Sequence, residues 1–146
     1  GYTLGLLLIP RILTQHQLLT LSAALGIILA ALIPFTNPES DTIAAILWGW
    51  TGISTLPDPI ALIALMGLAN AIVWPAVWPL ALEGLGHFTA RGSALLIMGI
   101  AGGAILPMVF GAIADSAGVL NAYWMTIPCY GFILFYAVKG CRLTKW

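Results

Sequence analysis

Four long apolar segments are the feature of this sequence that most restricts its fold. They comprise residues 18–35, 59–82, 94–114 and 120–138. Each is close to the roughly 20 residues that an α-helix needs to cross a bilayer. Since helices satisfy their backbone hydrogen bonds within one segment, the sequence predicts an all-α transmembrane fold with four spans.

Composition supports a membrane location for the whole chain. Of the 146 residues 61% are hydrophobic and only 7% are charged, with a mean hydropathy of +1.04. A water-soluble domain of this size does not need such a composition. Residues 1–10 are apolar but about half as long as a span, and the first residue is glycine, so we interpret the chain as a fragment that begins inside an earlier helix.

The connection between the first two spans contains an apolar segment of its own. Turn and cap residues occupy positions 37–41 and 57–59, and between them lies the segment 42–53. It is about twelve residues long, which is too short to cross a bilayer. Its two tryptophans, Trp48 and Trp50, are typical of a membrane interface.

The positions of the basic residues predict the orientation, because cationic connections stay on the cytoplasmic side. All of them fall before the first span, between the second and third, or after the fourth: Arg11, Arg91, Lys139, Arg142 and Lys145. The other connections carry acidic residues and no lysine or arginine. The predicted topology places the C-terminal tail, residues 139–146, in the cytoplasm.

The second span carries polar and aromatic residues where lipid alone would favour leucine. On a helix Asn70, Trp74 and Trp78 lie at i, i+4 and i+8 and form one stripe, and Pro75 and Pro79 lie on the neighbouring stripe. An indole face stacks on the C–H face of a sugar and an amide bonds its hydroxyls, so the stripe predicts half of a carbohydrate-type site. The alternative interpretation is an interhelical hydrogen bond for Asn70 and an aromatic-belt position for Trp78.

The third span has small residues at intervals of four, namely Gly99, Gly103 and Gly111, with Pro107 in the same series. Small residues at this spacing allow another helix to approach closely, which is the interpretation we prefer. Pro107 also interrupts the backbone hydrogen bonds, so this helix is a candidate for bending during gating.

Several kinds of chemistry are missing from the sequence. No Asp, Glu, Lys, Arg or His lies in the middle of a span, and His16 is expected in a loop before the first one. Cys129 and Cys141 would lie roughly 18 Å apart on a continuous helix, too far to form a disulfide, and neither has neighbouring metal ligands. We therefore predict no catalytic activity, no metal and no cofactor, and we expect any proton-coupling carboxylate outside this chain.

Two sequence runs resemble a known family. They are N-A-I-V-W-P-A-V-W-P-L-A-L-E at 70–83 and G-S-A-L-L-I-M-G-I-A-G-G-A-I-L-P at 92–107. Together with G-A-I-A-D at 111–115, they resemble the C-terminal half of a major facilitator superfamily sugar transporter, in the fucose:proton symporter branch and its bacterial glucose/galactose members. The resemblance implies that the four spans are the ninth to twelfth helices of a twelve-helix fold, with residues 1–10 as the end of the eighth.

The resemblance also implies roles for individual residues. Trp74-Pro75 matches the aromatic–proline pair of the family's tenth helix, where sugar is contacted, and Trp78 matches the aromatic that follows. Gly1, Gly5 and Arg11 match the glycine-and-basic pattern between the eighth and ninth helices. Tyr2 departs from that pattern, since related chains often carry arginine there.

These observations together predict part of a secondary transporter in the bacterial inner membrane. The expected substrate is a hexose resembling glucose, galactose or fucose, imported with protons by alternating access. The expected partners are the hexose, protons, the bilayer and the N-terminal half of the same chain, and no nucleic acid. Two alternatives stay open: a small four-helix multidrug exporter, and a non-transporting membrane assembly subunit.

Overall fold

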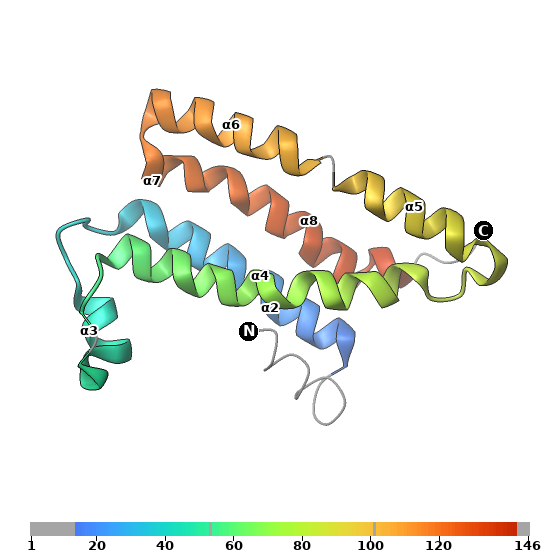
Figure 1. Cartoon of the computed structure of the whole chain (residues 1–146), viewed down its shortest axis with the longest axis horizontal. Coiled ribbons are helices and arrows are strands. Elements are labelled where there is room, and N and C mark those ends of the chain that lie inside the picture. Colours follow the sequence, from blue (N-terminus) through green and yellow to red (C-terminus); the bar gives the residue numbers. More distant parts are fainter. Residues whose placement is uncertain (1–13, 53, 101, 143–146) are drawn as a thin grey trace.

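The computed structural model describes residues 14–52, 54–100 and 102–142, and within these ranges the regular structure is helical (Figure 1). The longer elements are α2 (Gln15–Leu32), α3 (Thr42–Trp48), α4 (Asp58–Leu82), α5 (Thr89–Gly99), α6 (Gly102–Ala117) and α8 (Thr126–Val138). Shorter turns extend or join them: η1 (Ile33–Phe35), η2 (Gly49–Thr51), η3 (Gly86–Phe88), α7 (Val119–Ala122), η4 (Tyr123–Met125) and η5 (Gly140–Arg142).

Within the described ranges, four helical segments are long and apolar enough to cross a membrane. They are Gln15–Phe35, Asp58–Leu82, Gly86–Ala117 and Val119–Val138. Each contains one of the four segments predicted from hydropathy, so the prediction of an all-α chain with four candidate spans is confirmed. The matches to Gly1, Gly5, Arg11 and Tyr2 lie outside the described residues.

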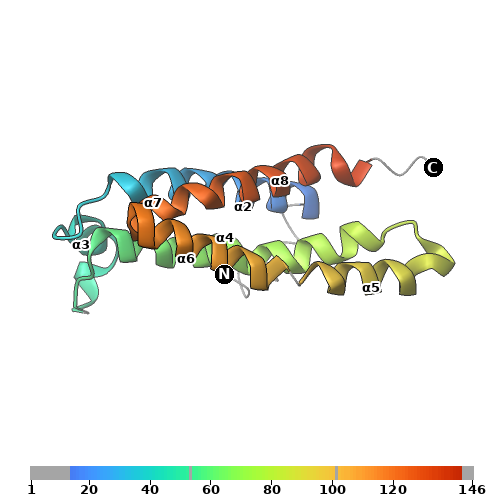
Figure 2. The same cartoon turned by 90° about the horizontal axis from the view of Figure 1, so that it is seen from above.

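Helix α2 is the centre of the packing and contacts both α4 and α8. Viewed from above, α2 and α8 form one layer, and α4 with α5 and α6 forms the other (Figure 2). The main core cluster joins α2, η1, α4 and α8 through Leu29, Ala30, Ile33, Leu62, Met66 and Tyr130. A second cluster lies towards the other end of the bundle and contains Leu19, Ala76, Leu80 and Ala137.

The start of α2 is fixed by a capping box. The Thr14 hydroxyl accepts a hydrogen bond from the Gln17 backbone N–H, and the Gln17 side chain accepts one from the Thr14 N–H. This reciprocal cap begins the helix at Gln15. The expectation that His16 lies in a loop is therefore wrong, because His16 occupies the first turn of α2.

Helix α4 stays one continuous helix through both internal prolines. Pro75 and Pro79 have no N–H, so each removes one bond from the helical ladder. The helix begins beside α3, where the Asp58 N–H donates to the Ser40 carbonyl at 2.7 Å. The Asp58 carboxylate in turn accepts a hydrogen bond from the Ile43 N–H at 2.8 Å, which attaches α3 to the start of α4. Helix α3 and η2 together span Thr42–Thr51, too short to cross a membrane as predicted.

The third span differs from the single helix predicted over 94–114. It consists of α5, which ends at Gly99, and α6, which begins at Gly102. The Ile100 N–H bonds the Ile97 carbonyl at 3.0 Å and the Gly103 N–H bonds the Ile100 carbonyl at 2.8 Å, a tighter pattern than that of an α-helix. The tandem glycines Gly102 and Gly103 have the least favourable helix propensity apart from proline, which explains why the break falls here and not at Pro107.

Candidate solute-binding cavity

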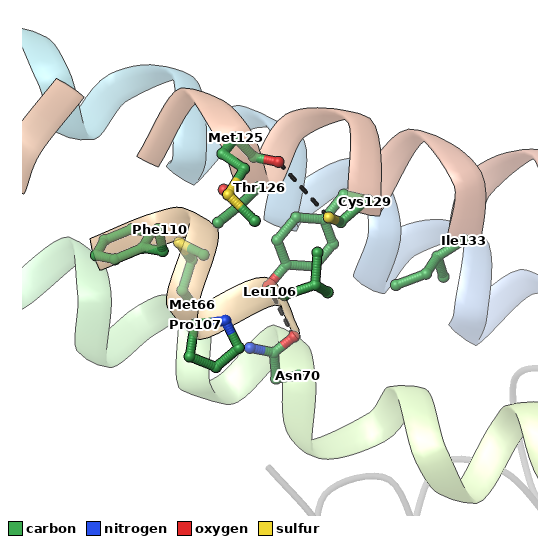
Figure 3. A pocket seen from close by; sticks show the side chains of 10 residues that line it. Met66, Asn70, Leu106, Pro107, Phe110, Met125, Thr126, Cys129 and Ile133 are labelled. Atoms are coloured by element: carbon green, nitrogen blue, oxygen red, sulfur yellow. Dashed lines mark hydrogen bonds between the residues drawn. The ribbon is translucent and has the colours of Figure 1, made fainter. Parts of the chain in front are cut away.

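A cavity of about 410 Å³ lies between α4, α6 and the α8 segment (Figure 3). Its volume falls within the roughly 300–1,000 Å³ typical of small-molecule sites. The lining is mostly apolar and is formed by Met66, Asn70, Leu106, Pro107, Phe110, Met125, Thr126, Cys129, Tyr130 and Ile133. Three separate candidate spans thus contribute to one cavity.

The main polar feature of this cavity is a hydrogen bond across the bundle. The Tyr130 hydroxyl of α8 donates to Asn70 Oδ1 of α4 at 2.7 Å. Figure 3 shows the Asn70 amide nitrogen directed towards Pro107. Among the described residues this nitrogen has no hydrogen-bond partner. The cavity therefore presents one amide donor within an apolar lining.

The other polar lining groups are bonded within their own helical turns. The Thr126 hydroxyl donates to the Tyr123 carbonyl at 2.7 Å. The Cys129 thiol lies 3.6 Å from the Met125 carbonyl, to which it donates. These groups have local acceptors, so the Asn70 amide is the lining donor best placed to meet a solute.

Two contacts with α2 hold this part of α4 and α8 in place. The Ser22 hydroxyl donates to the Ala69 carbonyl, next to Asn70. The Tyr130 ring packs directly over Gly26, where an added Cβ would lie 2.6 Å from the ring Cζ. Helices α2, α4 and α8 therefore meet at Asn70 and Tyr130 through two hydrogen bonds and one contact that only glycine allows.

The predicted tryptophan stripe lies in a different place from Asn70. Trp74 and Trp78 contact each other, with ring centroids 5.4 Å apart and ring planes at 51°. They line a separate open groove of about 610 Å³ between α4 and α5, together with Pro75, Pro79 and Ile97. The structure brings the two indoles together but does not place Asn70 in their groove.

Asn70 forms an interhelical hydrogen bond with Tyr130, which agrees with the alternative interpretation, and it also lines the cavity. Sugar contact by these three residues stays a prediction.

The glycine stripe of the third span faces open space within the described chain. A Cβ added at Gly99, Gly103 or Gly111 would meet no described atom within 4 Å outside its own helix. No residue of α5 or α6 is buried. Close helix packing at these glycines, and bending at Pro107, therefore stay predictions.

Both cysteines are free. Cys141 lies 3.2 Å from His16 Nδ1, so the expectation that neither cysteine has a potential metal ligand beside it is wrong for Cys141. This pair joins the ends of α2 and η5. The described residues contain no group of three or more His, Cys, Asp or Glu side chains that could hold a metal.

Sequence reasoning missed the residues that α8 contributes. Tyr130, Thr126 and Cys129 line the cavity, and Gly26 receives the Tyr130 ring. Tyr130 lies near the middle of a span, where its hydroxyl needs a hydrogen-bond partner, and this position is a sequence signal for an interhelical contact. The only amide in the middle of another span is Asn70, so the pair could have been proposed from the sequence.

The described residues form an all-helical arrangement with four candidate membrane spans and a solute-sized cavity between three of them, as in a multi-pass membrane protein. The chain is similar to the glucose/galactose transporter of Brucella abortus, with 46% identity over 77 residues, or 53% of this chain and 19% of the relative. It is also similar to the putative glucose/galactose transporter of Helicobacter pylori strain 26695, with 40% identity over 90 residues, 57% of this chain and 22% of the relative. The matched part thus covers about a fifth of each relative's length. No family model matches the chain, and no solved structure matches it. These similarities support a sugar-transporter family.

Proposed function

We propose that the intact protein imports a hexose across the bacterial inner membrane by proton symport with alternating access. This chain then supplies the ninth to twelfth helices of a twelve-helix major facilitator fold of the fucose:proton symporter branch, with its C-terminus in the cytoplasm. The observation that carries the proposal is the cavity between three spans, which offers the free Asn70 amide donor, in a chain similar to glucose/galactose transporters.

The lining of the cavity suits the two kinds of surface on a sugar. Apolar and aromatic side chains such as Phe110 and Leu106 accept the C–H face of the ring. The Asn70 amide donates to a hydroxyl oxygen. In this proposal the remaining polar contacts come from the other half of the intact protein.

The groove formed by Trp74 and Trp78 forms the second part of the proposed pathway. Trp74 is 49% exposed, and its indole presents an apolar face and one N–H donor along α4. We propose that the Trp74 indole contacts the sugar as the sugar moves between the cavity and one face of the membrane. The aromatic–proline resemblance at Trp74-Pro75 supports this assignment.

Proton coupling requires an ionisable group within the membrane. No Asp, Glu, Lys, Arg or His lies in the middle of the four spans. The proposal therefore places the coupling carboxylate in the other half of the intact protein. Uptake of glucose or galactose that does not depend on pH would reject proton symport without rejecting sugar transport.

Cys129 provides a direct test of the cavity because its thiol lies in the lining. In full-length protein with Cys129 as the sole cysteine, N-ethylmaleimide is expected to block hexose uptake, and excess glucose or galactose is expected to slow the labelling. A protein with Cys141 as the sole cysteine is the matched control and should show no protection. If excess sugar leaves the rate of Cys129 labelling unchanged, and the unlabelled protein takes up hexose, the sugar does not bind in this cavity.

Trp74 is tested by replacing it with alanine. We expect Trp74→Ala to raise the KM for hexose uptake by the full-length protein because a stacking surface is lost. Trp50→Ala is the control, since Trp50 lies in η2 and lines neither the cavity nor the groove. An unaltered KM would remove Trp74 from the pathway.

A further inference from the structure

Tyr130 is the described partner of the Asn70 amide oxygen, and its position is tightly restricted. The side chain is only 4% exposed. Its ring rests on Gly26 of α2 so closely that a Cβ there would overlap it. The hydroxyl therefore has little freedom to move away from Asn70.

An asparagine amide can face a cavity with either end, and the two ends have opposite hydrogen-bonding character. In the observed arrangement the Tyr130 hydroxyl donates to Oδ1 at 2.7 Å, which leaves the nitrogen facing the cavity (Figure 3). In the reversed arrangement the hydroxyl would accept from the amide, and its own hydrogen would need another acceptor. Among the described residues Tyr130 bonds no group besides Asn70. Leaving a buried donor unpaired is unfavourable, so the phenol selects the arrangement with the nitrogen outward.

We infer that Tyr130 is a positioning residue that holds the Asn70 side chain with its amide nitrogen towards the cavity, so that the site donates a hydrogen bond to an oxygen of the sugar. The inference rests on the proposed function and deepens it. A site built to bond a particular hydroxyl discriminates against the analogue that lacks it, because its own polar group is then left unpaired. Tyr130 thus controls selectivity for the hydroxyl without touching the sugar through its own oxygen.

The first experiment compares hexose uptake by full-length wild type and Tyr130→Phe. We expect the KM for the preferred hexose to rise about threefold to tenfold, the effect of one neutral hydrogen bond, with kcat nearly unchanged. The preference for that hexose over the deoxy analogue lacking the bonded hydroxyl should fall by a similar factor. Tyr123→Phe is the matched control, because Tyr123 precedes α8 and packs its ring against Phe110 but does not bond Asn70 with its hydroxyl.

A double-mutant cycle then tests whether Tyr130 acts through Asn70. Asn70→Leu removes the amide, so adding Tyr130→Phe to it should change the KM and the deoxy preference no further. Additive effects, or an unchanged deoxy preference in Tyr130→Phe, would overturn the inference while leaving hexose transport in place. Absence of glucose and galactose uptake by wild type would instead reject the proposed function, and the inference with it.

A second measurement requires only the wild type and Asn70→Leu. A fluorine in place of a hydroxyl can accept a weak hydrogen bond but cannot donate one. If Asn70 donates, the fluoro analogue at the bonded position should compete better for uptake than the deoxy analogue, and Asn70→Leu should abolish this difference. Equal competition by the fluoro and deoxy analogues at every ring position of the hexose would contradict donation by Asn70, even if Tyr130→Phe does not reach the membrane.

Discussion

At the scale of single residues, Gly26 decides how closely α8 can approach α2. The Tyr130 ring occupies the space that any Cβ at this position would need, and the same ring carries the hydroxyl that reaches Asn70. A glycine in the middle of a helix lowers its stability by roughly 0.5–1 kcal/mol relative to alanine. Here close packing compensates for that loss.

We therefore predict that Gly26→Ala destabilises the protein. The added methyl group must displace the Tyr130 ring, and overpacking of this kind typically costs about 1–3 kcal/mol. Gly67→Ala is the matched control, because a Cβ at Gly67 of α4 meets nothing within 4 Å and should be neutral or stabilising. Thermal unfolding in detergent measures both variants. Equal melting temperatures for the two would contradict the importance of the Gly26–Tyr130 contact.

At the scale of elements, the Asp58 carboxylate ties the first turn of α3 to the start of α4, beside the packing of Ile43 on the main core cluster. Asp58 is 7% exposed and accepts a hydrogen bond from the Ile43 N–H in the first turn of α3. A side chain from the next helix thus satisfies an N–H that α3 itself cannot bond. The outer side chains of α3 and η2 remain exposed, with Ile46 at 74% and Trp50 at 84%, which suits contact with a membrane interface.

Asp58→Ala is predicted to loosen α3 by about 0.5–2 kcal/mol, the usual value of such a cap. Amide hydrogen exchange at Ile43 should become faster, because the N–H loses its acceptor. Asp58→Asn keeps an oxygen in the same place and should preserve most of the protection. If the alanine and asparagine variants exchange at the same rate, the carboxylate does not anchor α3.

The interrupted third span has no buried residue in α5 or α6. The stripe containing Gly103 has no described neighbour, so a larger side chain there fits without disturbing α2, α4 or α8. We expect Gly103→Leu to express normally and bind hexose nearly as well as wild type, but to stop transport, because the break between α5 and α6 moves during gating. Met108→Leu, at a site that is 75% exposed, is the control. Loss of expression in Gly103→Leu alone would instead support a packing role for the stripe.

At the scale of the whole molecule, the distribution of basic residues predicts which end of the helical bundle faces the cytoplasm. Thiol labelling at the two ends tests this orientation. With Cys129 replaced by serine, native Cys141 at the end of α8 should react with a membrane-impermeant maleimide only after cells are permeabilised. Ser116→Cys, in the last turn of α6 at the opposite end of the bundle, should react in intact cells. This contrast follows from the cytoplasmic placement of the basic connections. Labelling of Cys141 in intact cells would contradict the topology.

The spans could be predicted from the sequence because each depends on its own residues. Hydropathy locates 59–82 and 120–138 without reference to any other part of the chain. The end of α5 at Gly99 and the start of α6 at Gly102 also reflect local residues, and the sequence predicts bending in this span from Gly103 and Pro107 without locating the interruption. Helical spacing also places Trp74 and Trp78 side by side, and the two indoles contact each other, whereas sugar binding by Asn70, Trp74 and Trp78 stays a prediction.

Amino-acid order alone determined the all-helical class and the four candidate spans of the described residues, because crossing a bilayer depends on length and apolarity within single segments. Only the tertiary structure decided which side chains meet: Tyr130 with Asn70 across 60 positions, and Cys141 with His16 across 125. Such pairs depend on how α2, α4 and α8 pack, which helical periodicity does not specify. The same packing placed Asn70 in one cavity and the tryptophans in another groove, since the two sites lie against different neighbours of α4.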